Sequence, residues 1–263
     1  MGPSVHDHLR GHLREVRAAL RVVTAVSSTL LLAAVGTESP TPATPVAAAR
    51  SLVVLVHGFG AGPDCWDATI PALGGPGVAV VTHRYTWTSS VETLGAQLAD
   101  EVTDMARRSG ARSVTLVGHS LGGVIVAASL AGGRLDGVVT RVVTVAAPLR
   151  GTRWAHLFPV GAVRDLRAGS PAVPAGVPWL AVASRADVVV DVHSAVPEGA
   201  EPVVVDGLGH CGLLKDPAVI ARIASGAVPA AVPARRERGV RARRSSEPRV
   251  RCGTRAAPAL VVA

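Results

Sequence analysis

The sequence contains few aromatic residues and few cysteines. Aromatic side chains make up 3% of the 263 residues, so stacking on nucleic-acid bases is not expected of this chain. Three cysteines are too few for a disulfide framework, although one bridge would be allowed. Hydrophobic residues, mostly Ala, Val and Leu, reach 48% and supply a sizeable core. The length fits one large domain or two small ones.

The sequence motifs of cofactor chemistry are also missing. No group of Cys and His residues has the spacing of a metal site. The sequence has neither a phosphate-binding P-loop nor the glycine fingerprint of a dinucleotide-binding fold. We therefore expect no metal, no cofactor and no nucleic-acid partner.

The N-terminal apolar run is short for a membrane span. It covers residues 22–35, whereas a spanning helix needs about 20 residues. Four arginines precede it, as a basic n-region precedes the apolar part of a signal peptide. We expect a secreted or membrane-associated protein; the alternative is a cytoplasmic one with an amphipathic N-terminal helix. Residues 1–50 would then be a signal peptide or anchor that ends in a Pro/Thr linker.

The formal net charge of +8 belongs mainly to the C-terminal end of the chain. Residues 227–263 hold nine arginines against two glutamates, whereas residues 51–226 hold 13 basic and 14 acidic side chains. This distribution predicts one folded domain over 51–226 and a disordered Arg/Pro-rich tail over 227–263. Blocks of like charge are usually solvated, so nucleic-acid or anionic-lipid binding by the tail is the weaker interpretation.

Strand-like and helix-like patterns alternate along residues 51–226. Residues 90–108 carry apolar side chains every three or four positions, which predicts a helix that ends at Gly110. A last helix is expected over 217–224. Short apolar runs predict buried strands at 52–56, 78–82, 114–117, 138–145, 179–183 and 202–205. This order predicts an α/β fold with a mostly parallel sheet of about six strands and helices on both faces.

The centre of the chain carries a nucleophile motif. Gly-His-Ser-Leu-Gly, residues 118–122, follows the strand at 114–117 and precedes an apolar helix at 124–131. A strand, a tight turn and a helix are the context that a nucleophile elbow requires. Glycines at both ends of the motif relieve crowding, and Ser120 is expected to have a positive φ. The sequence therefore predicts Ser120 as a nucleophile; the alternative is a serine that caps an ordinary strand–helix turn.

A serine nucleophile needs a histidine base and an acid that orients the base. In hydrolases with such an elbow the acid and then the histidine follow the serine along the chain. His210 lies in a short glycine-flanked loop just after a strand, which favours it over His156 and His193. The acid is expected to be Asp187, a few residues after the strand at 179–183, in preference to two other aspartates. These are Asp191 and Asp206.

Acyl transfer also needs donors that hold the oxyanion. One is expected to be the backbone N–H of Leu121, directly after the nucleophile. The other is expected in the loop His57-Gly58-Phe59-Gly60 after the first strand, and we assign it to the N–H of Phe59. This tetrapeptide by itself could also be an ordinary glycine turn.

Five segments together resemble the lipases of the α/β-hydrolase fold. The likeness is to the small bacterial lipase A type, a triacylglycerol lipase, and to the related GPI inositol-deacylase-like hydrolases. The segment around His210 is the most specific of the five and the acid segment is the loosest. The matching segments, which lie within roughly 52–225, are 56–60, 118–123, 147–152, 184–190 and 207–214. The resemblance implies a minimal hydrolase sheet and ester hydrolysis through an acyl-enzyme.

The substrate-binding residues are less evident from the sequence. Residues 150–178 lack a clear element and could form a small lid, a wall for an acyl chain or a surface crossover. The candidates that would contact substrate are His57, Gly58, Trp154, Leu157 and Phe158. The resemblance implies short to medium acyl esters.

Cys65 and Cys211 are both expected near the proposed base and oxyanion loop, above the carboxyl edge of the sheet. A bridge between them would fit an exported enzyme. The alternative is that each packs as a small hydrophobic residue.

The sequence as a whole favours a monomeric carboxylic-ester hydrolase, a lipase or esterase. Its substrate would be a small-molecule or lipid ester, with contact to a lipid surface as a further expectation. The same parts serve thioesterases, amidases and acyltransferases, so these remain alternatives. A ligand-binding module without catalysis is another, although a binder has no need of all three triad members in order.

Overall fold

The computed structural model describes residues 46, 49–157, 161–167 and 176–227. Phe158 and almost all of the N-terminal segment and of the Arg/Pro-rich tail lie outside these residues, so the predictions for them do too. Among the helices that the structure describes, none is long and apolar enough to cross a membrane.

The predicted sheet is confirmed, and all six of its strands run parallel. Their order is β2-β1-β3-β4-β5-β6, so the first strand lies inside the sheet and the last at one edge. All but the last are buried along most of their length, as expected when helices cover both faces. The strands are β1 (Ser51–Val56), β2 (Val78–His83), β3 (Ser113–His119), β4 (Val139–Val145), β5 (Trp179–Ser184) and β6 (Glu201–Val205).

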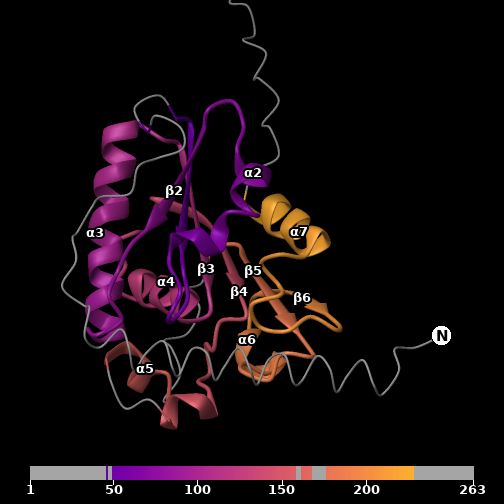
Figure 1. Ribbon diagram of the computed structural model, residues 1–263. Coiled ribbons are helices and arrows are strands. Elements are labelled where there is room, and N and C mark those ends of the chain that lie inside the picture. The colour runs from indigo at the N-terminus through magenta and orange to yellow at the C-terminus, as the bar shows by residue number, and fades with distance from the viewer. Residues whose placement is uncertain (1–45, 47–48, 158–160, 168–175, 228–263) are drawn as a thin grey trace, which may run out of the picture. The chain divides into compact units, whose positions relative to one another are not determined.

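Helices cover the sheet on two sides (Figure 1). On one side α3 (Val91–Ser109) and α4 (Leu121–Ala131) pack with one face of the strands into the larger core. On the other side α2 (Ile70–Leu73) and α7 (Pro217–Ala227) contribute to a second core around Trp66. The α/β prediction with helices on both faces is therefore confirmed.

The two long helices differ in pattern because they differ in burial. α3 buries one stripe and exposes charged residues on the other, and Ser90 caps its start by accepting the Thr93 N–H at 3.1 Å. It ends at Gly110 with φ 66°, as the sequence predicts. α4 is buried over nearly its whole length between α3 and the sheet, so it is apolar all round.

The segment between β4 and β5 holds more structure than the sequence predicts. A 3-10 turn η3 (Arg153–His156) and a short helix α5 (Gly161–Asp165) lie where we expect no clear element. Two other short elements are likewise not predicted from the sequence. These are η2 (Pro63–Trp66) and α6 (Val192–Ala195). Elements of four or five residues carry too little periodicity to be detected in a sequence.

Candidate active site

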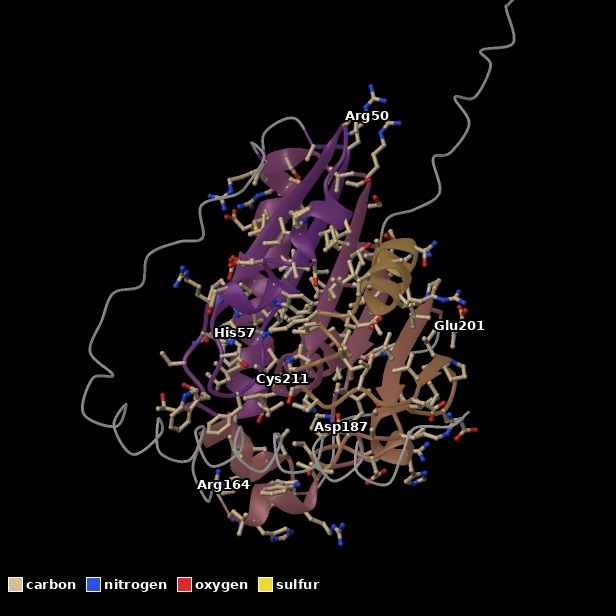
Figure 2. All side chains as sticks on the ribbon, turned by 45° about the vertical axis from the view of Figure 1, so that its right-hand side comes forward. Arg50, His57, Arg164, Asp187, Glu201 and Cys211 are labelled. Carbon is tan, nitrogen blue, oxygen red and sulfur yellow. The ribbon has the colours of Figure 1, made fainter. Side chains whose placement is uncertain are left out.

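The carboxyl ends of the parallel strands bring four loops to one edge of the sheet. These are the loops after β1, β3, β5 and β6. Figure 2 shows His57, Asp187 and Cys211 near one another at this edge, and Arg50, just before β1, at the far end. Ligand sites of open parallel sheets lie at this edge because loops from several strands converge there.

The nucleophile motif forms a sharp turn between β3 and α4. Ser120 has φ 53° and ψ −126°, the positive φ that the sequence predicts. A non-glycine residue in this region is strained, and such strain is held only where surrounding contacts enforce it. One such contact is the hydrogen bond that the Ser120 N–H donates to the Val145 carbonyl, at 2.9 Å. The turn leaves Ser120 partly exposed at the start of α4.

Two glycines permit this turn because other backbone lies where a side chain would be. A Cβ at Gly118 would meet the backbone of Gly123, and one at Gly122 would clash with the carbonyl oxygens of Val56 and His57. The start of α4 therefore rests directly on the end of β1. Gly58 is packed just as closely, since a Cβ there would lie 3.0 Å from the Ser120 Cβ.

Ser120, His210 and Asp187 form one hydrogen-bonded chain. His210 Nε2 lies 2.9 Å from Ser120 Oγ, and His210 Nδ1 lies 2.7 Å from Asp187 Oδ2. Both distances are in the range of good hydrogen bonds. The Asp187 side chain is fully buried, and that of His210 is 13% exposed. The structure thus brings together the three residues that the sequence selects from distant segments.

The Asp187 carboxylate is held on both of its oxygens. While Oδ2 faces His210, Oδ1 accepts the backbone N–H groups of Val189 at 2.8 Å and Val190 at 3.0 Å. A buried carboxylate needs such partners to offset its lost hydration. These contacts orient the carboxylate toward the imidazole.

The rival residues have other partners in the structure. Asp191 accepts the Ser194 N–H at 2.8 Å and caps α6, and Asp206 pairs with Arg185 at 3.1 Å. His193 contacts the Arg150 guanidinium. His156 is exposed at the end of η3.

Two side chains outside the site predicted from the sequence hold the loop that carries His210. Ser184 Oγ, at the end of β5, donates to the Leu208 carbonyl at 2.6 Å. His119 Nε2 lies 3.3 Å from the His210 carbonyl. The sequence positions of both residues could have indicated this role. Ser184 directly follows the strand predicted at 179–183, and His119 directly precedes Ser120.

The loop after β1, in which the sequence predicts an oxyanion donor, lies against Ser120. Phe59 is partly exposed there, and Leu121 is buried as the first residue of α4. His57 is buried, stacks on Tyr85 and has Nδ1 3.0 Å from the Gly58 carbonyl. Burial lowers the pKa of His57.

The remaining candidates for substrate contact lie around η3. The Trp154 indole N–H donates to the Val188 carbonyl at 2.8 Å, so this side chain packs on the loop that carries Asp187. Leu157 is 65% exposed, and among the described residues it is the one large hydrophobic side chain that is exposed.

The two described cysteines are in the thiol form, so the bridge allowed by the sequence is not present in this structure. Burial, with smaller contributions from Asp64 and Cys211, raises the pKa of Cys65 to about 12. The Cys65 thiol therefore stays protonated near neutral pH and is a poor nucleophile. Among the described residues, no group of His, Cys, Asp and Glu is placed to hold a metal ion.

His119 makes the stability of the protein sensitive to acid. Burial, and next the nearby His210, lower its pKa to about 3. Between pH 6.5 and 3 the unfolded chain binds a proton at this residue that the folded protein does not, so stability falls as pH falls. The cost is about 1.4 kcal/mol per pH unit once the unfolded residue is protonated.

We expect His119→Gln to flatten this dependence. Glutamine can still donate to the His210 carbonyl but does not titrate. In urea unfolding at pH 6, 5 and 4, the wild type should lose about 1 kcal/mol per pH unit more than the variant. His57 is present in both proteins, so most of its own contribution is common to the two profiles. Parallel pH profiles for the two proteins would contradict the assignment.

An all-parallel six-stranded sheet with this turn after its third strand defines the α/β-hydrolase class of folds. The model of the Alpha/beta hydrolase family matches residues 53–188, which is more than half of the sequence. The chain belongs to this family. No curated protein matches the sequence.

Similar solved structures include a lipase, a protein with ferulic acid bound and a thioesterase. The mature form of the Bacillus licheniformis lipase BlEst2 is 18% identical, with a TM-score of 0.58 over 67% of this chain and 92% of that one. Est1E from Butyrivibrio proteoclasticus, with ferulic acid bound, is 15% identical, with a TM-score of 0.55 over 70% of this chain and 93% of that one. The RedJ thioesterase of the Streptomyces coelicolor prodiginine pathway is 19% identical, with a TM-score of 0.53 over 73% of this chain and 93% of that one. At these identities the likeness establishes the fold alone.

Proposed function

We propose that this protein is a serine hydrolase that cleaves carboxylic esters, of the lipase or esterase type, through an acyl-enzyme intermediate. The observation that carries the proposal is the continuous chain from Ser120 Oγ through His210 to Asp187, with contacts of 2.9 and 2.7 Å. A hydroxyl becomes a useful nucleophile when a base accepts its proton and an acid holds the base in the right tautomer. The site geometry supports all three roles.

In the proposed reaction Ser120 Oγ attacks the ester carbonyl carbon and its proton passes to His210 Nε2. Asp187 stabilises the imidazolium that results. The tetrahedral oxyanion receives the backbone N–H groups of Phe59 and Leu121, and the positive end of α4 points at it. Collapse breaks the bond to the alkoxy group, which takes the proton from His210 and leaves as the alcohol. Water, activated by His210, then cleaves the acyl-enzyme.

The substrate would be a small-molecule or lipid ester with a short to medium acyl chain. The exposed Leu157 and the Trp154 ring near the Asp187 loop support an apolar wall for the acyl group. Thioester hydrolysis is the second candidate, because the RedJ thioesterase has the same fold. Ser120, with His210 as its base and Asp187 as the acid, would attack a thioester carbonyl in the same way.

Covalent labelling and a substrate series test this proposal together. A fluorophosphonate should modify Ser120, as located by mass spectrometry of tryptic peptides. Hydrolysis of p-nitrophenyl acetate, butyrate, octanoate and palmitate should be fastest for butyrate or octanoate. A protein that leaves the esters intact but hydrolyses butyryl thioesters would be a thioesterase. A folded protein that is neither labelled nor active on either class would contradict the proposed function.

A further inference from the structure

Tyr85 is the only tyrosine of the chain, and it lies just beyond β2, outside the residues assigned to catalysis. Its hydroxyl donates to the backbone carbonyl of His57 at 2.8 Å. This carbonyl belongs to the first residue of the loop after β1, two residues before Phe59. A residue of the segment after β2 therefore contacts the backbone of the proposed oxyanion loop directly.

The Tyr85 ring itself contacts two histidine rings. It stacks on His57 with ring centroids 4.4 Å apart and planes within 11°, and on His83 at 5.9 Å and 16°. His83 is fixed in turn by Glu101 of α3, since Nδ1 and Oε2 are 2.6 Å apart. Burial raises the pKa of Tyr85, which keeps the hydroxyl protonated and able to donate.

A second contact from the same segment reaches the same loop. The Trp87 ring meets the Phe59 ring edge-on, with centroids 5.0 Å apart. The Trp87 carbonyl accepts the Ala162 N–H at 2.9 Å, and Asp165 of α5 accepts the Val91 N–H at 2.9 Å. The segment after β2 is thus anchored to α5 while two of its side chains hold the oxyanion loop.

We propose that Tyr85 is a positioning residue for the oxyanion loop, which its hydroxyl fixes through the His57 carbonyl. The inference rests on the proposed function, because only a developing oxyanion gives the loop its catalytic purpose. The His57 carbonyl and the Gly58 N–H share one rigid peptide plane. Holding the carbonyl therefore sets the direction in which the chain leaves β1 toward Phe59.

Such a contact matters because the two glycines of the loop give its backbone wide conformational freedom. Gly58 and Gly60 permit many backbone angles, and Gly60 has φ 67°. Oxyanion donors act only if they are in place before the charge develops, and a displacement of about 1 Å can cost 10²-fold in rate. Tyr85 restricts this freedom from a rigid neighbouring segment.

The test is Tyr85→Phe, which keeps the stacked ring and removes only the hydroxyl. We expect kcat for p-nitrophenyl butyrate to fall by about 10- to 100-fold while KM changes by less than about threefold, because the donor is displaced mainly in the transition state. Thr86→Ala is the matched control. Thr86 is exposed in the same segment, so this variant should keep kcat within about twofold of the wild type.

Amide hydrogen exchange of the peptide that covers residues 57–61 gives a readout that does not need turnover. Exchange in this peptide should be faster in Tyr85→Phe than in the wild type or the control. Unchanged exchange would overturn the inference, and so would an unchanged kcat in a variant that only melts at a lower temperature. If the wild type hydrolyses no ester but exchange still accelerates, the proposed function fails and the anchoring of the loop by Tyr85 stands.

Discussion

Replacing Ser120 by alanine is expected to lower kcat for p-nitrophenyl butyrate by a factor of about 10⁵. Removing the nucleophile of a serine hydrolase usually lowers kcat by about 10⁴–10⁶, because the oxyanion donors and substrate binding alone retain only about 10³–10⁴-fold acceleration over the reaction in water. The backbone at this position should persist, because the N–H bond to the Val145 carbonyl does not involve the hydroxyl. The activity should therefore vanish without loss of the fold, as circular dichroism and the melting temperature would show.

Ser129→Ala is the matched control for this experiment. Ser129 is buried on the same helix, α4, and its hydroxyl donates to the Val126 carbonyl at 2.7 Å. Its replacement removes a buried hydroxyl without touching the site, so kcat should stay within about twofold of the wild type. A Ser120→Ala protein that keeps more than a tenth of the wild-type rate would show that another residue is the nucleophile.

Gly122→Ala is expected to cause the largest loss of stability of any single methyl addition near the site. The new Cβ would clash with the carbonyl oxygens of both Val56 and His57, which are backbone atoms that cannot rotate away. α4 would have to move off the end of β1, in the middle of the larger core. We expect a cost of about 3 kcal/mol or more, which corresponds to a fall in Tm of roughly 6–12 °C.

Gly132→Ala separates this clash from the general effect of adding a methyl group. Gly132 lies at the other end of α4 with φ −89°, and a Cβ there would approach only Arg134 Cγ, at 3.9 Å. Its Tm should stay within about 2 °C of the wild type. Differential scanning calorimetry compares the two variants, and equal Tm values for Gly122→Ala and the wild type would refute the close contact between α4 and β1.

Prediction from the sequence was successful where local pattern and local chemistry agree. The strands were found because each is a run of β-branched or other apolar residues buried from both sides. The turn at Ser120 was found because its two glycines are required within the motif itself. The end of α3 was found because Gly110 adopts a left-handed conformation that other residues avoid.

Short elements and long-range partners could not be found in the same way. α5 and α6 have five and four residues, about one turn each, and depend on contacts such as those of Asp165 and Asp191 rather than on helical periodicity. The contact between Tyr85 and the His57 carbonyl joins residues 28 positions apart in the chain. Neither segment has a sequence feature that indicates this contact.

The order of strands and helices, the elbow at Ser120 and the histidine loop were determined by the sequence alone, because each depends on neighbours within a few residues. The sequence favours Asp187 as the acid, but only the tertiary structure shows which of the candidate carboxylates contacts the His210 ring. Asp187, Asp191 and Asp206 all follow strands in suitable places, but β5 and β6 pair side by side in a register that sets Asp187 against the His210 ring. That register is a property of the sheet, and no single segment contains it.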